Sequence, residues 1–385
     1  MAADSRILPA AASAAFLAEG GALRRGPRAP QRRRPAAFYE KFEALALAYD
    51  CFWHEDGQRI LIVGPPPLNL KRAWATARFL AMPSGTDLAL QSFVSGSVMV
   101  TALSGAPPGT QTVKLTLDGE CFALLVQPNL SPMLAGRRLL FTMSKDNDLG
   151  WVRSWADYHA RRHGADALLF FDNGSTRYGI GDIEETLLSV PGLRHVAVAS
   201  WPFKYGSPDP AVLNNPFYTL FLQIGAMSVA LRRYGARAAG ILNCDIDELV
   251  YTPRGTTIFE LAAQSPKGLV VMEGRFIEAV TAAEHPIHAD FTERLKGAEA
   301  RRSSPRKWAL DPGRDWVRNL AVHPYMHWIN GRPAFAKTQR PDVFYWHFRG
   351  ISTNWKDRRT ETGHLDPAML EADRDWMEES GRLKA

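Results

Sequence analysis

The chain is poor in cysteine and has no long apolar run, and both shortages limit the classes of protein to which it can belong. Its 385 residues include three cysteines, and none stands in a CxxC or zinc-finger spacing. This pattern predicts a reducing compartment and no disulfide framework. No run of 18 or more apolar residues occurs, and the stretch from Ala10 to Ala18 is too weakly apolar for a signal sequence. We therefore expect a cytoplasmic protein.

An excess of charge is also missing from most of the chain. The formal net charge is +6, and residues 1–37 hold seven arginines against Asp4 and Glu19, so this segment carries five of the six charges. A nearly neutral body lacks the basic surface that binds nucleic acids, so we expect no specific nucleic-acid partner. The basic segment could contact anionic lipid headgroups at the inner face of the membrane, or only solvent.

Composition divides the chain into four segments. Residues 1–37 are rich in Ala, Arg, Pro and Gly without periodicity, which predicts a disordered basic tail. Residues 38–136 contain short apolar runs separated by turn residues, including the hairpin signal Asp118-Gly119, and predict a small β-rich domain. Residues 351–385 predict a helical extension with an amphipathic helix from Asp366 to Arg382.

Between residues 137 and 350, apolar strands alternate with segments of helical periodicity. Asp148 to Arg162 has helical spacing, and Ala167 to Phe171 is an apolar strand that ends in a polar turn. Repeated strand and helix units predict an α/β fold with a Rossmann-like, mostly parallel sheet and helices on both faces. Ligands of such folds bind beyond the carboxyl ends of the strands.

Two carboxylates, one residue apart, follow an apolar run at one such strand end. Because side chains on a strand alternate between faces, Asp245 and Asp247 can project together while Ile246 packs inward. Such a pair suits Mn²⁺ or Mg²⁺, whose remaining positions are taken by water and phosphate oxygens. An ordinary loop or cap is the alternative for an isolated D-x-D. Asp172 ends another strand, where it could bond a nucleotide base or ribose, or simply close a turn.

Two pairs of histidines have i, i+4 spacing, His159 with His163 and His323 with His327. Neither pair has the HExxH form, so a dedicated zinc site is not expected. His323 could still complete a cation site as a neutral imidazole. His347 lies among aromatic residues, a setting typical of a core histidine.

Several motifs together resemble those of glycosyltransferase family 92 (DUF23-like) and related bacterial members of the GT-A superfamily, over about residues 139 to 356. In order, the matching residues are Lys145-Asp146-Asn147-Asp148, Trp151 to Tyr158-His159, Phe170-Phe171-Asp172-Asn173-Gly174-Ser175, Gln223, Tyr234, Asp245-Ile246-Asp247-Glu248, Lys307-Trp308 with Pro312, His323, and Trp346-His347-Phe348-Arg349. Their order and spacing, rather than any single motif, carry the resemblance.

The resemblance implies a GT-A domain that transfers a hexose from a nucleotide sugar, with a UDP-linked donor expected, to a carbohydrate or glycoconjugate, as in polysaccharide biosynthesis, with inversion at the anomeric carbon. It also implies roles for individual residues: nucleoside contacts for Lys145, Asp146, Asn147 and Asp172, metal ligation for Asp245, Asp247 and His323, and a diphosphate contact for Lys307. Gln223 and His347 match family positions without an assigned role.

The sequence departs from the family pattern in two places. The first loop, Asn147-Asp148, differs from the family's asparagine and acidic pair by a one-residue variation, which puts its nucleoside contacts in question. The strand after the metal motif lacks the usual tryptophan. An inverting transfer needs a base for the acceptor hydroxyl, and Glu273 and Glu278 on that strand are the candidates. Their odd separation means that a straight strand presents only one of them to a site.

Two other functional classes fit parts of the sequence. An apolar strand followed by D-x-D also begins haloacid-dehalogenase-like phosphatases, although there the motif comes early in the domain. A nucleotide-sugar-binding protein without catalysis would keep Asp172 and tolerate loss of the metal site.

Overall fold

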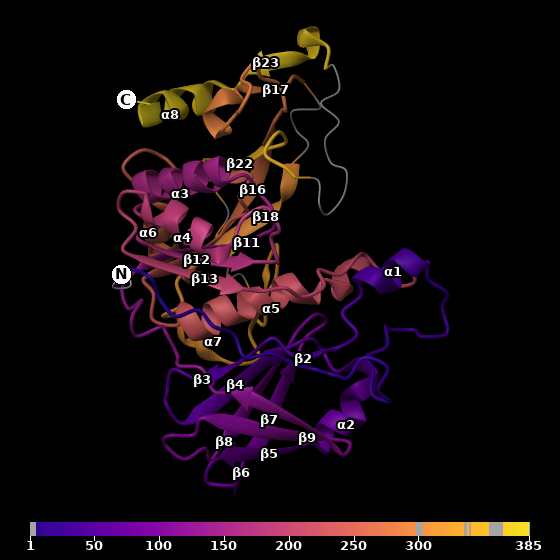
Figure 1. Ribbon diagram of the computed structural model, residues 1–385. Helices are drawn as coiled ribbons and strands as arrows, with labels where there is room; N and C mark the ends of the chain where they lie inside the picture. The colour runs from indigo at the N-terminus through magenta and orange to yellow at the C-terminus, as the bar shows by residue number, and fades with distance from the viewer. Residues whose placement is uncertain (1–4, 298–302, 335–336, 339, 354–364, 385) are drawn as a thin grey trace.

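A computed structural model describes residues 5–297, 303–334, 337–338, 340–353 and 365–384 (Figure 1). A central sheet with helices on both faces forms the upper body, and smaller antiparallel sheets lie below it, beyond α5 (Figure 1). Over these described ranges, no helix has both the length and the apolar character needed to cross a bilayer.

The central sheet has nine strands and is mixed in direction. Its first four strands are parallel, and the remaining pairs include three antiparallel ones. In spatial order the strands are β13 (His195–Ser200), β12 (Ala167–Asp172), β11 (Arg138–Ser144), β14 (Gly240–Asn243), β18 (Ser303–Leu310), β16 (Leu269–Ile277), β22 (Phe344–Phe348) and β15 (Glu248–Tyr251), with β21 (Lys337–Thr338) beside β16. Five of the eight strand pairs are parallel, and only β18 and β15 run against the other strands, so the predicted mostly parallel sheet is found as a mixed sheet with two reversed strands. The direction of β18 and β15 depends on pairings between segments far apart in the chain, which periodicity does not encode.

Helices cover both faces of this sheet, as predicted. Alternate residues of β11 enter different cores, because Leu139 packs with α5 residues and Leu140 with Trp155 of α3. The helices of this part are α3 (Leu149–His163), α4 (Ile180–Leu188), α5 (Phe221–Val229, continued by a π-helical turn, Ala230–Tyr234), α6 (Ile258–Gln264) and α7 (Asp315–Arg318). The side chain of Asp148 caps α3 by accepting a hydrogen bond from the Gly150 amide at 2.8 Å, and Gly164 ends it at φ 65°.

The region from residue 38 to residue 136 forms two four-stranded antiparallel sheets, in agreement with the expected β-rich composition. One contains β3 (Asp50–Trp53), β4 (Arg59–Gly64), β8 (Met99–Ser104) and β7 (Ala89–Val94), and the other β10 (Glu120–Leu125), β9 (Thr112–Leu117), β5 (Arg78–Met82) and β6 (Thr86–Asp87). In the chain, α1 (Ala36–Lys41) comes before β3, and α2 (Lys71–Ala75) lies between β4 and β5. Asp118-Gly119 forms the predicted hairpin turn. Leu61 and Val63 of β4 belong to the same hydrophobic core as Ile224 of α5. Because this core continues across the proposed domain boundary between residues 136 and 137, that boundary stays a prediction.

The prediction of a disordered basic tail is wrong for residues 5–37; residues 1–4 lie outside the described ranges. Arg25 is only 2% exposed, and its guanidinium donates to the carbonyl oxygens of Pro66 at 2.9 Å and Ala46 at 2.6 Å. β1 (Ala15–Phe16) pairs with β2 (Ala46–Ala48). The segment has no hydrophobic core of its own. Its scattered apolar residues pack against apolar residues of the rest of the chain, and its arginines donate hydrogen bonds to carbonyl oxygens there.

The predicted C-terminal helix is shorter than expected. Its first part is a 3-10 turn (Pro367–Met369) and a strand, β23 (Leu370–Ala372), that pairs with β17 (Glu293–Leu295). The helix α8 spans Arg374–Lys384 and buries Trp376 against Trp346 of β22, with ring centroids 5.0 Å apart. Residues 354–364 and 385 of the predicted extension lie outside the described ranges.

Candidate functional site

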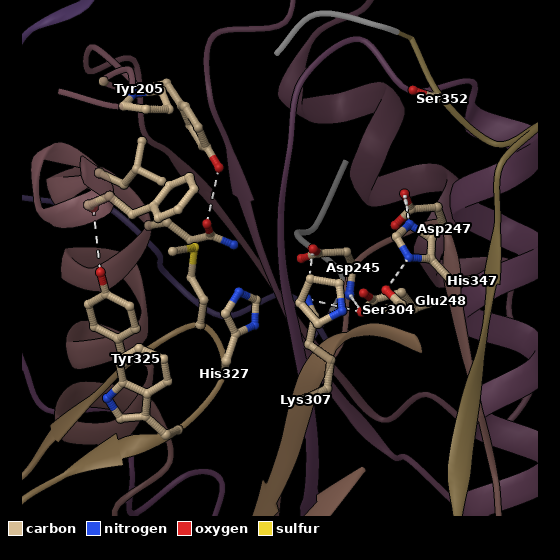
Figure 2. A pocket seen from close by; sticks show the side chains of 18 of the residues that line it. Tyr205, Asp245, Asp247, Glu248, Ser304, Lys307, Tyr325, His327, His347 and Ser352 are labelled. Carbon is tan, nitrogen blue, oxygen red and sulfur yellow. Dashed lines mark hydrogen bonds and ion pairs between the residues drawn. The ribbon is translucent and has the colours of Figure 1, made fainter. Parts of the chain in front are cut away.

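A cavity of about 690 Å³ opens where β14 ends. One wall is polar and comes from the segment after β14 and from β18 and β22, while the opposite wall is aromatic (Figure 2). The polar wall contains Asp245, Asp247, Glu248, Ser304, Lys307 and His347, and the other wall contains Tyr205, Phe217, Leu220, Gln223, Tyr325, Met326, His327 and Trp328. Position at the carboxyl ends of parallel strands agrees with the site expected for an α/β fold.

The acidic segment adopts the predicted alternation. Cys244 is fully buried and Ile246 is 3% exposed, whereas Asp245 and Asp247 both line the cavity. The segment is closed by Glu248, whose carboxylate accepts a hydrogen bond from the Asp245 amide at 2.9 Å. The chain then turns back as β15, and this tight closure fixes both aspartates at one edge of the sheet.

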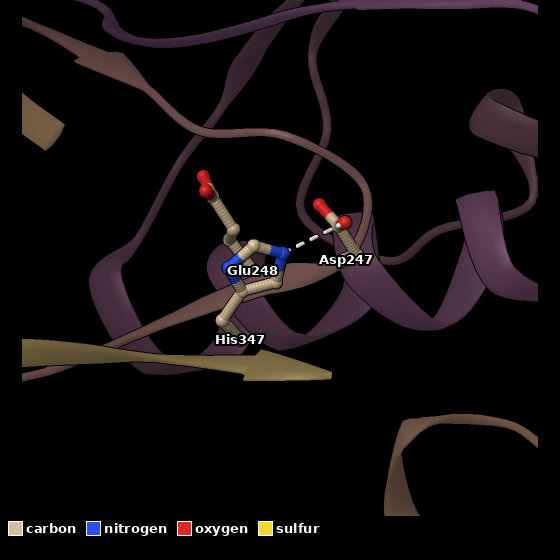
Figure 3. Close-up of side chains that lie close together, drawn as sticks. All are labelled: Asp247, Glu248 and His347. Carbon is tan, nitrogen blue, oxygen red and sulfur yellow. Dashed lines mark hydrogen bonds and ion pairs between the residues drawn. The ribbon is translucent and has the colours of Figure 1, made fainter. Parts of the chain in front are cut away.

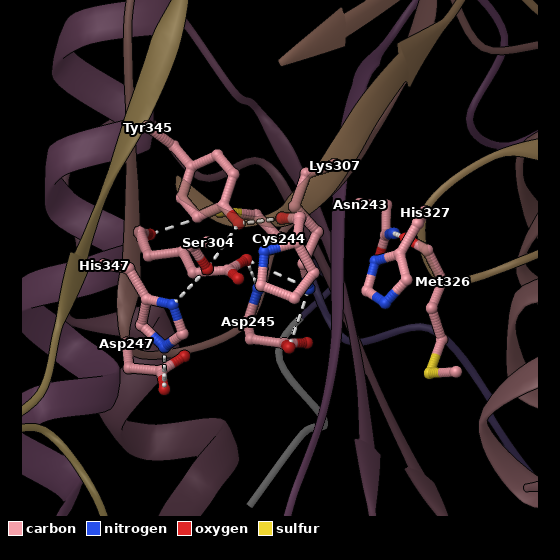
Figure 4. Close-up of polar contacts among 12 residues, drawn as sticks. Asn243, Cys244, Asp245, Asp247, Ser304, Lys307, Met326, His327, Tyr345 and His347 are labelled. Atoms are coloured by element: carbon pink, nitrogen blue, oxygen red, sulfur yellow. Dashed lines mark hydrogen bonds and ion pairs between the residues drawn. The ribbon is translucent and has the colours of Figure 1, made fainter. Parts of the chain in front are cut away.

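Asp245 forms an ion pair with a buried lysine of β18. Nζ of Lys307 lies 2.7 Å from Oδ2 of Asp245 and 3.0 Å from Oε2 of Glu248 (Figure 4). Burial alone would lower the pKa of Lys307, but the two carboxylates outweigh it and raise the pKa well above its ordinary value. Burial also raises the pKa of Glu248 to about 7, against the opposing effect of Lys307. Lys307 is therefore a permanent positive charge in the polar wall.

Asp247 pairs instead with a histidine of β22. Nε2 of His347 lies 3.0 Å from Oδ2 of Asp247, and Nδ1 lies 2.6 Å from the Ser304 hydroxyl oxygen, which in turn lies 2.9 Å from the Tyr345 hydroxyl (Figure 4). Burial acts to lower the pKa of His347, yet the Asp247 carboxylate more than compensates, so the pKa is raised. Tyr345, Ser304, His347 and Asp247 thus form one hydrogen-bond chain that leads to the acidic segment.

The donor atoms of Asp247, Glu248 and His347 all lie within 4.8 Å of one another (Figure 3), and this is the one such group found among the described residues. Two carboxylates and an imidazole are donors that Mn²⁺ accepts, and Mg²⁺ accepts the carboxylates. The residues therefore fit a divalent cation. Because its ligands must be deprotonated, binding would displace the proton shared by His347 and Asp247.

The structure does not bring His323, the predicted third ligand, to this group. His323 belongs to β19 (His323–Pro324), is 3% exposed and does not line the cavity. Burial, with a contribution from Arg232, lowers its pKa to about 4. The histidine four residues later, His327, does line the cavity. The spacing of this pair is visible in the sequence, but only the fold determines which of the two reaches the site.

The predicted nucleoside contacts lie at the same edge of the sheet but outside the cavity lining. Asp172 ends β12, and its carboxylate accepts a hydrogen bond from the Ser175 amide at 3.1 Å. The carboxylate of Asp146 accepts from the Thr176 amide at 2.7 Å, and Asn147 donates to the Ser144 hydroxyl at 2.7 Å. These side chains hold two loops together; Lys145 stands beside them after β11.

The three other predicted site residues fall in different places. Gln223 of α5 lines the cavity and accepts a hydrogen bond from the Tyr205 hydroxyl at 3.1 Å. Glu273 lies outside the cavity and pairs with Arg306 at 3.2 Å, and Glu278 lies behind Arg349 at 3.3 Å. An irregularity in β16 between Met272 and Gly274 shifts the register there. Neither of the two predicted bases lines the cavity.

Comparison with known proteins finds only weak structural similarity. No family model and no curated protein matches the chain. Among solved structures, the mannosyltransferase Ktr4p from S. cerevisiae in complex with GDP matches with a TM-score of 0.25 and 11% identity, over 37% of this chain and 40% of that one. Core-mannan synthase A from Aspergillus fumigatus, in an Mn/GDP form, matches with a TM-score of 0.23 and 10% identity, over 37% and 42%. The chain thus spans about two fifths of these proteins. Membership of family 92 is not shown, and scores this low add no weight to any function.

Proposed function

We propose that the chain is a divalent-cation-dependent glycosyltransferase that moves a sugar from a nucleotide-sugar donor to a carbohydrate or glycoconjugate acceptor. The observation that carries the proposal is the convergence of Asp247, Glu248 and His347, with the Lys307 cation beside them, on one wall of a single cavity. A volume of about 690 Å³ lies in the range of small-molecule sites.

Each group on the polar wall has a task in this proposal. Asp247 and His347, with Glu248 next to them, would hold Mn²⁺ or Mg²⁺, which supplies Lewis-acid stabilisation of the departing diphosphate. Lys307 adds a fixed positive charge on the same wall, where it attracts the diphosphate and offsets the neighbouring carboxylates. A UDP-linked donor and inversion at the anomeric carbon follow from the family 92 resemblance and belong to the proposal.

Binding measurements on the purified chain test the proposal. We expect UDP or GDP to raise the melting temperature in the presence of Mn²⁺ and much less without it, because a ligand that binds only the folded state stabilises it, by about 2.7 kcal/mol at one hundred times its Kd. Mn²⁺-dependent consumption of the corresponding nucleotide sugar would then separate a transferase from a protein that only binds the donor.

The variant Asp247→Asn should lose the Mn²⁺-dependent shift and the turnover while it keeps the circular dichroism spectrum of the wild type. Asp87→Asn is the matched control, because Asp87 also forms an ion pair, in its case with Arg78, but lies on an exposed strand, with its side chain 67% exposed. Normal Mn²⁺ dependence in Asp247→Asn would contradict the metal assignment. Absence of any nucleotide effect on the wild type would contradict the proposed function as a whole.

A further inference from the structure

The aromatic wall of the cavity contains a rigid hairpin tip. The strands β19 and β20 (Ile329–Asn330) are joined by residues 325 to 328, closed by a hydrogen bond from the Tyr325 amide to the Trp328 carbonyl at 2.8 Å. Trp308 donates to the Tyr325 carbonyl at 2.7 Å, and Asn243 donates to the Met326 carbonyl at 3.2 Å. Since Asn243 is the last residue of β14, the tip is tied directly to the strand that leads into the acidic segment.

This tip carries an aromatic pair at the cavity, in which Trp328 is partly exposed and Tyr325 is 2% exposed behind it. The rings of Tyr325 and Trp328 are stacked, with centroids 4.6 Å apart and planes inclined by 14°. The indole nitrogen of Trp328 donates to the Asn330 side chain at 2.7 Å, which fixes the plane of the indole. Such a platform suits the flat, C–H-bearing face of a pyranose ring, which packs against the electron-rich face of an aromatic ring.

His327 lies between this platform and the polar wall. In Figure 2 its ring stands between the side chains of Tyr325 and Lys307. Nδ1 lies 2.8 Å from the Arg306 carbonyl oxygen. A carbonyl only accepts hydrogen bonds, so Nδ1 carries the proton and Nε2 of the neutral ring has the free lone pair. Burial lowers the pKa of His327, which keeps the ring neutral near pH 7.

We propose that His327 is the general base that takes the proton of the acceptor hydroxyl, and that Trp328, backed by the buried ring of Tyr325, forms the subsite for the sugar ring of that acceptor. This inference rests on the proposed function. In the step, the acceptor O–H bond breaks and its proton passes to Nε2 of His327, while the acceptor oxygen bonds to the anomeric carbon. The bond from that carbon to the diphosphate breaks, and its electron pair leaves with the diphosphate.

The position of the candidate bases supports this assignment. Glu273 and Glu278, the carboxylates expected on β16, do not line the cavity and pair with Arg306 and Arg349. His327 lines the cavity on the side opposite His347, and its hydrogen bond to Arg306 fixes its ring. A base must be within hydrogen-bond reach of the proton it takes, and a ring between the acceptor platform and the diphosphate-binding wall meets that condition.

The test uses the full chain with Mn²⁺, UDP-glucose and GDP-mannose as donors, and a panel of alkyl and aryl glycosides as acceptors. We expect His327→Gln and His327→Ala to lower kcat for transfer by about 100-fold or more, the usual contribution of a general base. Their affinity for UDP or GDP should stay within about twofold of the wild type, and added imidazole should partly restore transfer in His327→Ala. His285→Gln, at an exposed histidine, is the control and should behave as the wild type.

The acceptor subsite is tested with Trp328→Ala and Trp328→Phe. We expect Trp328→Ala to raise the acceptor KM about tenfold, the size of an aromatic contact of 1 to 1.5 kcal/mol, with Trp328→Phe closer to the wild type. Transfer by His327→Gln at the rate of the wild type would overturn the base assignment. Loss of UDP or GDP affinity in Trp328→Ala would instead assign the platform to the nucleobase. Failure of the proposed function is distinguishable, because it shows in the wild type as absent nucleotide binding.

Discussion

Nζ of Lys307 lies 2.7 Å from Oδ2 of Asp245, just beyond the carboxyl end of β14 in the central sheet. The first aspartate of the acidic pair is thus already neutralised by a cation that belongs to the chain. The second aspartate is joined to His347 and forms the group of donor atoms that fits a metal ion. The two carboxylates point the same way, but the fold gives them different partners and therefore different tasks.

We expect Lys307→Met to destabilise the protein by about 3 kcal/mol, because it leaves the carboxylates of Asp245 and Glu248 together without their buried partner. Mn²⁺ should stabilise this variant more than the wild type, since the wall is then more negative. Urea unfolding with and without Mn²⁺ measures both effects. Lys267→Met, at an exposed lysine, is the control. A loss below about 1 kcal/mol would mean that the pair has little influence on stability.

Ser304→Ala should lower the affinity for Mn²⁺ by about tenfold, with little change in melting temperature. A histidine that binds a metal through Nε2 donates its Nδ1 proton to a neighbouring acceptor, and Ser304 Oγ is 2.6 Å from that atom in His347. Electron paramagnetic resonance of free Mn²⁺ gives the affinity. Ser92→Ala removes a hydroxyl that bonds Thr101 in the β-rich region and serves as control. Unchanged affinity in Ser304→Ala would show that His347 does not bind the metal.

Two glycines on helices should respond to alanine with opposite signs. A Cβ at Gly225 of α5 would lie 2.5 Å from the Tyr49 ring, where α5 packs on the β-rich region, so Gly225→Ala should destabilise. Gly181 of α4 has open space around it, and Gly181→Ala should stabilise by about 0.5 to 1 kcal/mol through helix propensity. Thermal unfolding compares the two variants. Stabilisation by both would mean that the contact between α5 and Tyr49 is loose.

Stability should decrease as the pH falls below about 6.5, partly because of His163. Burial lowers its pKa well below the ordinary value of 6.5, and the ring is held neutral by the Val250 carbonyl at 2.8 Å and the Ile258 amide at 3.3 Å. A group whose pKa is lower in the folded state binds more protons when unfolded, so its stabilisation is complete above the unfolded pKa and is lost below it.

Between pH 6.5 and its folded pKa, such a histidine contributes about 1.4 kcal/mol per pH unit to the slope of stability against pH. Urea unfolding from pH 7.5 to 5 measures this slope. We expect His163→Gln to show a slope smaller by that amount, and His285→Gln, at an exposed position, to show the slope of the wild type. Equal slopes in all three proteins would show that His163 is not held neutral.

Local patterns in the sequence determined those features that depend on neighbouring residues. Alternation along the strand end was sufficient to predict that Asp245 and Asp247 face one way while Ile246 packs inward, and the Asp118-Gly119 pair predicted a hairpin. The order of strands and helices likewise predicted helices on both faces of a sheet. These features follow from backbone geometry and side-chain period, which act over a few residues.

Tertiary structure alone decided the rest, because the partners are far apart in the chain. Nothing near His323 or His327 tells which of them reaches the cavity, since this depends on bonds from Asn243 and Trp308 to the hairpin tip. The order of the arginine-rich first segment depends on tertiary contacts, such as the hydrogen bonds that Arg25 donates to the carbonyl oxygens of Ala46 and Pro66. The direction of β18 and the pairing of Lys307 with Asp245 likewise result from packing across the whole sheet, where each contact is selected by long-range geometry rather than by local composition.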